Sequence, residues 1–317
     1  MHEQVPASAA AGKDPVVRLQ NVTKRIGGKT IIDKLTLDVP TGEVFGFLGP
    51  NGSGKTTTIR MMVGLMGLTD GEIMIRGCSI KTEYEKAIRH VGAIVENPEM
   101  YKYLTGYQNL LHYARMIPGI TRQRIDEVVA LVGLKERIND KVKTYSLGMR
   151  QRLGVAQAVM HKPSLLILDE PTNGLDPAGI RELRDYLRQL ARTEGITVFV
   201  SSHLLSEMEL MCDRVAIIQS GRLLDVRALN GAAETGLTGT VVHFEVDRPE
   251  EAVKLLEAEG VPVTLAGALL SMNIDRETAA GINARLVGAG FKVYGFRSVA
   301  KSLEDQFLEV TGGEGIV

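Results

Sequence analysis

The segment from Gly49 to Thr56 constrains this chain more than any other, because it fits the pattern G-x-x-x-x-G-K-[ST] without a substitution. Residues 42–48 before it read as a strand, and residues 56–66 after it show the apolar spacing of a helix. A glycine-rich loop between a strand and a helix can turn its N–H groups inward around phosphate oxygens. A plain glycine-rich turn is the alternative, and the flanking strand and helix argue against it.

We therefore expect this loop to bind the phosphates of a nucleotide. Lys55 would reach the terminal phosphates, and the Thr56 hydroxyl would ligate a magnesium ion. The residues predicted to bind the nucleotide here are Gly49, Pro50, Asn51, Gly52, Ser53, Gly54, Lys55, Thr56 and Thr57.

The composition bounds the classes of protein to which the chain can belong. With 317 residues, 44% of them hydrophobic, it can bury a full core and leave room for a second small domain. Its net charge is −1 with interspersed signs, which argues against a nucleic-acid partner. The two cysteines, Cys78 and Cys212, fit no metal or redox spacing, as expected in a reducing cytosol. No segment suits a membrane span or a signal peptide, so we expect a soluble chain that would need another chain to cross a membrane.

The order of apolar segments predicts an α/β fold. Continuous apolar runs at 165–169, 197–201 and 215–219 alternate with helical segments, which is typical of a mostly parallel sheet buried on both faces. Residues 97–162 read as helical and predict a helical insert. Strands at 16–19, 32–39 and 72–75 would form an antiparallel β edge near the strand of the phosphate loop.

The composition shifts to Ala, Gly, Asn and Thr after Asp225, and this shift reads as a linker. Beyond it, strand and helix signals follow in the order β-α-β-β-α-β, which predicts a small α+β, ferredoxin-like domain. This C-terminal domain carries no chemical motif, so we expect it to be regulatory or to serve assembly. The predicted organisation is a disordered lead-in at 1–14, a domain that carries the phosphate loop at 15–225 with its helical part at about 97–162, a linker at 226–239 and an accessory domain at 240–317.

Two strand ends carry candidate catalytic residues. Asp169 and Glu170 end the apolar run at 165–169, and ligands bind at that edge of an open α/β sheet. We expect Asp169 to hold the magnesium ion and Glu170 to polarise an attacking water. His203 follows the neighbouring strand, so it would open onto the same edge and hold the terminal phosphate or the water.

Ser146 precedes an amphipathic helix expected at 150–161, and it is a natural helix cap. A plain capped helix explains this segment by itself. The functional alternative is that Ser146, Gly148 and the helix N-terminus donate hydrogen bonds to a phosphate. Because the chain already has its own phosphate loop, that phosphate would belong to a nucleotide held by another subunit.

Five motifs together resemble those of ATP-binding cassette (ABC) proteins. The phosphate loop, the segments 145–149 and 165–170, the segment 173–176 and His203 occur in the order and the approximate spacing of that family, over about residues 16–225. The resemblance implies a P-loop NTPase cassette that binds ATP and Mg²⁺ and forms a head-to-tail homodimer. It further implies that Glu170 is the catalytic base, that Asp176 crosses the dimer seam and binds the nucleotide, and that Glu96 contacts magnesium.

The tail and its segment 302–308 resemble exporter subunits of the bacitracin and lantibiotic type. Three positions depart from the family pattern. Glu96 replaces a glutamine, Leu147 and Met149 replace a glycine and a glutamine of the signature, and Ile26 stands where an aromatic ring usually stacks on adenine. We expect weaker or relaxed recognition of the base, because an aromatic platform contributes about 1–3 kcal/mol per base.

The resemblance therefore implies an ATP-hydrolysing transporter subunit that powers export of a peptide antibiotic, a drug or a similar amphiphile through integral membrane permease subunits. Such a subunit would lie at the cytoplasmic face of the membrane, attached through the permease. One alternative is a soluble cassette ATPase that acts on ribosomes or DNA, although the single phosphate loop and the lack of a sustained heptad run argue against it. Another is an ATP-dependent regulatory module whose C-terminal domain senses a ligand.

Overall fold

The computed structural model describes residues 14–229, 240–267 and 269–300, which fall into a larger unit (14–229) and a smaller unit (240–300). Residues 1–13 of the predicted lead-in, residues 230–239 of the predicted linker and the 302–308 segment lie outside the described residues. Within the described ranges, no helix combines the length and the apolar character that a membrane crossing requires.

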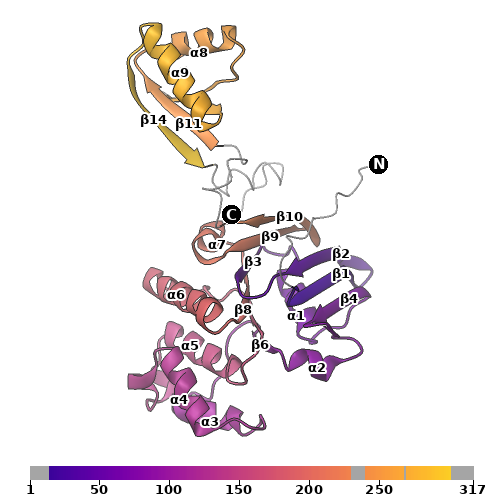
Figure 1. Cartoon of the computed structure of the whole chain (residues 1–317). Helices are drawn as coiled ribbons and strands as arrows, with labels where there is room; N and C mark the ends of the chain where they lie inside the picture. Colours follow the sequence, from indigo (N-terminus) through magenta and orange to yellow (C-terminus); the bar gives the residue numbers. More distant parts are fainter. Residues whose placement is uncertain (1–13, 230–239, 268, 301–317) are drawn as a thin grey trace. The chain divides into compact units, whose positions relative to one another are not determined.

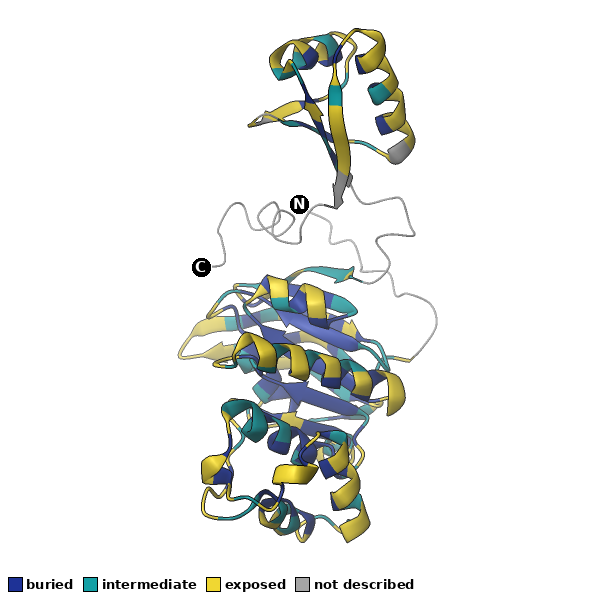
Figure 2. Ribbon diagram, turned by 90° about the vertical axis from the view of Figure 1, so that its left-hand side faces the viewer, coloured by how far each residue is buried: buried dark blue, intermediate teal, exposed yellow. Residues whose placement is uncertain are grey.

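A six-stranded sheet forms the centre of the larger unit (Figure 1), in the order β10-β9-β3-β8-β7-β6. The five strands from β9 to β6 run parallel, and only β10 at the edge pairs antiparallel. The strands β3, β7 and β8 are buried throughout, as a sheet covered on both faces requires (Figure 2). The mostly parallel sheet is therefore confirmed. Its strands are β3 (Val44–Leu48), β6 (Val91–Ile94), β7 (Leu165–Leu168), β8 (Thr197–Ser202), β9 (Arg214–Gln219) and β10 (Arg222–Ala228).

A second, separate sheet of four antiparallel strands has the order β2-β1-β4-β5, so the expected antiparallel part is also confirmed. Its first two strands are longer than predicted and meet in a hairpin at Gly27 and Gly28, both with positive φ. Buried residues of both sheets and of helix α1 share one hydrophobic cluster, which fixes α1 against both sheets. The strands are β1 (Val17–Ile26), β2 (Lys29–Val39), β4 (Asp70–Ile75) and β5 (Cys78–Ser79).

Helices cover the parallel sheet and form the predicted insert between β6 and β7. Helix α1 ends at Met62, although apolar spacing continues to Met66, because Gly64 adopts a φ of 75° that ends the helix. Helix α5 begins at Leu147 rather than at residue 150, because Ser146 caps it. The helices are α1 (Lys55–Met62), α2 (Tyr84–Ile88), α3 (Gly106–Ala114), α4 (Arg122–Leu131), α5 (Leu147–Ala158), α6 (Pro177–Thr193) and α7 (Leu205–Met211), with short 3₁₀ turns η1 (Lys135–Arg137) and η2 (Val142–Thr144).

The smaller unit has the element order β-α-β-β-α-β, with an antiparallel sheet in the order β12-β13-β11-β14. Its core contains Phe244 and Leu270 from the sheet, with Leu256 and Ile282 from the two helices. The elements are β11 (Thr240–Val246), α8 (Pro249–Ala258), β12 (Thr264–Ala266), β13 (Leu269–Asn273), α9 (Arg276–Gly288) and β14 (Val293–Ala300).

Candidate nucleotide site

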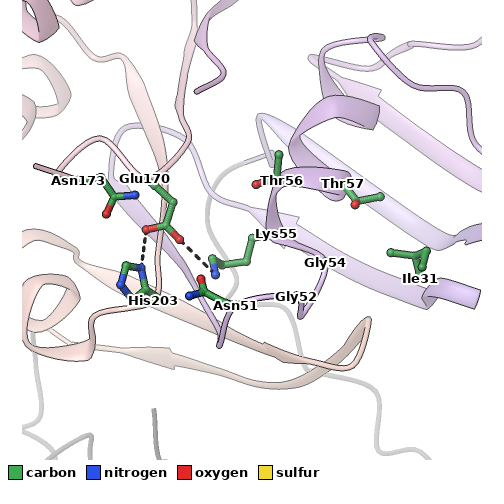
Figure 3. Close-up of a pocket in the computed structure, with 10 residues that line it drawn as sticks. All are labelled: Ile31, Asn51, Gly52, Gly54, Lys55, Thr56, Thr57, Glu170, Asn173 and His203. Atoms are coloured by element: carbon green, nitrogen blue, oxygen red, sulfur yellow. Dashed lines mark hydrogen bonds and ion pairs between the residues drawn. The ribbon is translucent and has the colours of Figure 1, made fainter. Parts of the chain in front are cut away.

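A pocket of about 440 Å³ lies where the strands β3, β7 and β8 end. Because these strands are parallel, their carboxyl ends reach the same edge of the sheet and bring distant segments together. Figure 3 shows Lys55, from the start of α1, pointing toward Glu170 and His203, which come from the segments after β7 and β8. The lining residues are Ile31, Asn51, Gly52, Gly54, Lys55, Thr56, Thr57, Glu170, Asn173 and His203.

The phosphate loop has the backbone geometry that its glycines allow. Gly52 and Gly54 adopt φ values of 79° and 107°, which side-chain-bearing residues rarely reach. A Cβ at Gly49 would lie 2.3 Å from the carbonyl oxygen of Ile218, so only glycine fits there. The Ser53 hydroxyl is buried and has no hydrogen-bond partner among the described atoms. The loop therefore opens the N-terminus of α1 toward the pocket, where an anion is favoured.

The Lys55 side chain is 5% exposed, and its ammonium lies between the phosphate loop and Glu170. Its Nζ donates to the carbonyl oxygens of Gly49 at 2.7 Å and Pro50 at 3.3 Å. The same Nζ lies 3.2 Å from the Glu170 Oε1, so a buried cation and a carboxylate form an ion pair (Figure 3). Phosphate oxygens that enter the pocket would meet this ammonium directly.

Glu170 joins the phosphate loop to the end of β8. Its Oε2 accepts a hydrogen bond from the Nδ1 of His203 at 2.8 Å, and its other oxygen pairs with Lys55. The Glu170 backbone has a φ of 48°, a left-handed conformation that is unusual for a residue with a side chain. Its N–H donates to the Ser201 hydroxyl at 2.9 Å, which holds the residue in this conformation.

Asp169 does not line the pocket. It is buried, and its Oδ1 accepts a hydrogen bond from the Ser201 hydroxyl at 2.6 Å. Thr56 lines the pocket itself. A hydroxyl and a carboxylate are oxygen ligands of the kind that Mg²⁺ takes together with substrate phosphates. This donor set fits magnesium bound with a nucleotide, and among the described residues no cluster of three or more His, Cys, Asp or Glu could hold a metal ion by itself.

Glu96, the third predicted magnesium ligand, is not brought to the pocket. It follows β6 with a φ of 69°, is 65% exposed, and forms an ion pair with Arg60 of α1. The prediction came from the resemblance to ABC proteins, and in this structure the guanidinium of Arg60, on helix α1, binds the Glu96 carboxylate.

Ser146, Gly148 and Asp176 also lie away from this pocket. Ser146 caps α5 as predicted, since its hydroxyl accepts from the N–H of Met149 at 3.2 Å. Asp176 caps α6 through the N–H of Gly179 at 2.9 Å. Both residues therefore have a structural role within the chain, and neither contacts the Lys55 pocket of its own chain.

Several residues in or beside the pocket were assigned no role from the sequence. Ile31 and Asn173 line the pocket, and Ser201 bonds both Asp169 and the backbone of Glu170. The sequence held a signal for Asn173, which stands three residues after Glu170, and for Ser201, which is one of the hydroxyl residues that end β8. The sequence held no such signal for Ile31, because this residue belongs to strand β2 of the other sheet.

Comparisons with known proteins agree with this geometry. The family model described as ABC transporter matches residues 32–173. The ABC transporter ATP-binding protein YhcH of Bacillus subtilis (strain 168) is 56% identical over 94% of this chain and 96% of its own. The bacitracin transport ATP-binding protein BcrA of Bacillus licheniformis is 38% identical over 94% of this chain and 98% of its own.

Among solved structures, the dimeric ATP-binding cassette MJ0796 in a post-hydrolysis state, bound to ADP and Pi, is 26% identical with a TM-score of 0.60. That match covers 68% of this chain and 99% of the cassette. The soluble-ATPase alternative is not favoured, because the relatives that match nearly the whole chain are transporter subunits. This chain belongs to the ABC transporter family, in which it is an ATP-binding subunit with the cassette ATPase fold.

Proposed function

We propose that this chain is the ATPase subunit of an exporter for a peptide antibiotic or a similar amphiphile, and that it works as a homodimer with separate integral membrane permease subunits. The observation that carries the proposal is the match to BcrA over 302 residues, which extends well beyond the larger unit. A cassette alone, such as MJ0796, accounts for 68% of this chain. The likeness to a bacitracin transport subunit thus includes the smaller unit as well.

In the proposed reaction, Lys55 and the N–H groups at the start of α1 bind the phosphates of ATP. The phosphates compete with Glu170 for the Lys55 ammonium, 3.2 Å away, and free this carboxylate to accept a hydrogen bond from a water. That water attacks the γ-phosphorus, its proton passes to Glu170, and the bond to the ADP oxygen breaks. His203 holds the Glu170 carboxylate through its Nδ1 during this step.

Magnesium, when bound, would neutralise phosphate charge, with Thr56 and Asp169 as its protein ligands. Glu96 would join them only after it leaves Arg60.

Ser146, Gly148 and Asp176 do not line the pocket, and in the proposed homodimer they would face the nucleotide of the other copy. The MJ0796 cassette dimer supports this proposal. Attachment to a permease would place the chain at the cytoplasmic face of the membrane.

The test is purification of the tagged full-length chain from detergent-solubilised membranes, with its partners identified by mass spectrometry. We expect a small integral membrane protein to accompany the chain. Ribosomal RNA or DNA in its place would overturn the assignment.

Export is tested in cells that carry the chain together with this membrane protein. We expect higher resistance to a bacitracin-type peptide with the wild-type pair, and no gain with a Glu170→Gln pair expressed at the same level. Equal resistance from both pairs would show that ATP hydrolysis at this site does not drive export.

A further inference from the structure

A second layer of hydrogen bonds joins the two segments that hold Glu170 and His203. The Thr172 Oγ1 donates to the Glu207 Oε2 at 2.6 Å. The Ser202 Oγ lies 3.5 Å from the same carboxylate oxygen and accepts from the N–H of Leu204 at 2.9 Å. Thr172 and Ser202 are 4% and 1% exposed. One oxygen of Glu207, in the first turn of α7, thus receives a hydroxyl from each segment.

These two hydroxyls stand next to the reacting groups in the chain. Thr172 follows Glu170 by two residues, and Ser202 immediately precedes His203. Glu170 adopts a left-handed backbone conformation that its surroundings must maintain. The bond from Thr172 to Glu207 ties the segment after Glu170 to α7, in addition to the bond from the Glu170 N–H to Ser201.

Glu207 itself does not line the nucleotide pocket. Glu207 instead lines a separate groove of about 260 Å³ between α6 and α7, together with Ile180, Leu210 and Met211 among others. Any effect of Glu207 on catalysis would therefore act through the residues it holds.

We infer that Glu207 is a positioning residue for ATP hydrolysis. Its carboxylate fixes the segment after β7 relative to the end of β8, and so keeps the Glu170 carboxylate and the His203 ring at their 2.8 Å contact, facing the pocket. The inference rests on the proposed function, because it assigns Glu207 to hydrolysis at that same site. ATP binding depends on Lys55 and the phosphate loop, which Glu207 does not touch.

The competing explanation is structural. A carboxylate in the first turn of a helix also stabilises the helix by its charge. The two explanations differ for Glu207→Gln, which removes the charge but keeps an oxygen that can accept the Thr172 hydrogen bond. Glu207→Ala removes both. The same comparison is made at the hydrogen-bond donor, because Thr172→Val removes the hydroxyl and Thr172→Ser keeps it.

The experiment measures kcat and KM for ATP with the purified full-length chain. We expect Glu207→Ala to lower kcat by about 10- to 100-fold with KM changed less than about threefold, because a misplacement of about 1 Å can cost about 100-fold in rate. Glu207→Gln and Thr172→Ser should keep most of the wild-type kcat, and Thr172→Val should match Glu207→Ala. The double variant Glu207→Ala with Thr172→Val should lose no more than either single one.

Glu209→Ala serves as the matched control, since it makes the same change at an exposed carboxylate of the same helix. Thermal melts and ATP binding verify that each variant is folded, and if Glu207→Ala does not fold, the two Thr172 variants decide the question. A wild-type kcat in Glu207→Ala, or an equal loss in Glu207→Gln, would overturn the inference. Absence of hydrolysis by the wild-type chain would instead overturn the proposed function, so the two failures are distinguishable.

Discussion

The ion pair between Lys55 and Glu170 leads to a prediction with two opposite effects. Glu170→Gln keeps the shape of the side chain but removes the charge that lies 3.2 Å from the buried ammonium. We expect this variant to hydrolyse ATP about 100- to 10,000-fold more slowly, because the general base is lost. We also expect it to bind ATP more tightly than the wild type, because the phosphates no longer compete with a carboxylate for Lys55.

The size of the second effect follows from the geometry. At 3.2 Å and an effective dielectric constant of about 20, the attraction between the two charges is about 5 kcal/mol. Desolvation of both groups offsets most of it. Because the Glu170 side chain is only 17% exposed, we take the net free energy of the Lys55–Glu170 ion pair as about 1–2 kcal/mol. Loss of this competition corresponds to an ATP dissociation constant about 5- to 30-fold lower in Glu170→Gln.

The assay is titration of each full-length variant with a fluorescent ATP analogue, together with phosphate release under the same conditions. His203→Ala is the control, because it should slow hydrolysis while leaving the Lys55–Glu170 pair in place. Its ATP affinity should therefore stay near that of the wild type. Unchanged or weaker ATP binding by Glu170→Gln would refute the competition, and hydrolysis within about tenfold of wild type would refute the assignment of Glu170 as the base.

Three further changes probe the rest of the structure. Gly92→Ala would place a Cβ 2.1 Å from the carbonyl oxygen of Ala158. We therefore expect the free energy of unfolding, measured by urea titration, to fall by about 1–3 kcal/mol. The uncrowded Gly67→Ala should cost less, and an equal loss would contradict the steric account. Burial lowers the pKa of His161 below its usual 6.5, so the unfolded chain takes up this proton more readily and stability should fall as the pH drops below about 6.5. His161→Gln should flatten that fall, and an unchanged pH dependence would refute the assignment. Ile26, 49% exposed at the end of β1, offers no ring to a base, so Ile26→Tyr should tighten ATP binding by up to about 1–3 kcal/mol and raise the preference for ATP over GTP, as measured by nucleotide competition. No change in either quantity would show that the base does not reach this position.

The sequence was sufficient to predict the parts of the site that depend on strand ends. The phosphate loop follows β3, Asp169 and Glu170 follow β7, and His203 comes one residue after β8. Each of these positions can be predicted from the residues next to it in the sequence. The parallel arrangement of the strands then brings them to one edge of the sheet. The apolar runs that signal buried strands were therefore the decisive information.

Contacts that join different elements could not be read in this way. The Arg60–Glu96 pair, the Lys55–Glu170 pair and the bond from Thr172 to Glu207 each depend on how two elements pack. The edge strand β10 and the five-residue helix α2 were missed, because a half-exposed edge and a single helical turn leave little periodicity.

Light scattering of the Glu170→Gln full-length chain, with and without ATP and magnesium, tests the central claim most directly. If two copies hold ATP between the phosphate loop of one and the Ser146 segment of the other, the mass should rise on adding ATP from that of one 34.5 kDa chain to twice that value. Replacing Ser146 by a bulky charged residue should prevent the rise. A Glu170→Gln chain that binds ATP but remains at the mass of one chain, with its membrane partner present or absent, would contradict the account.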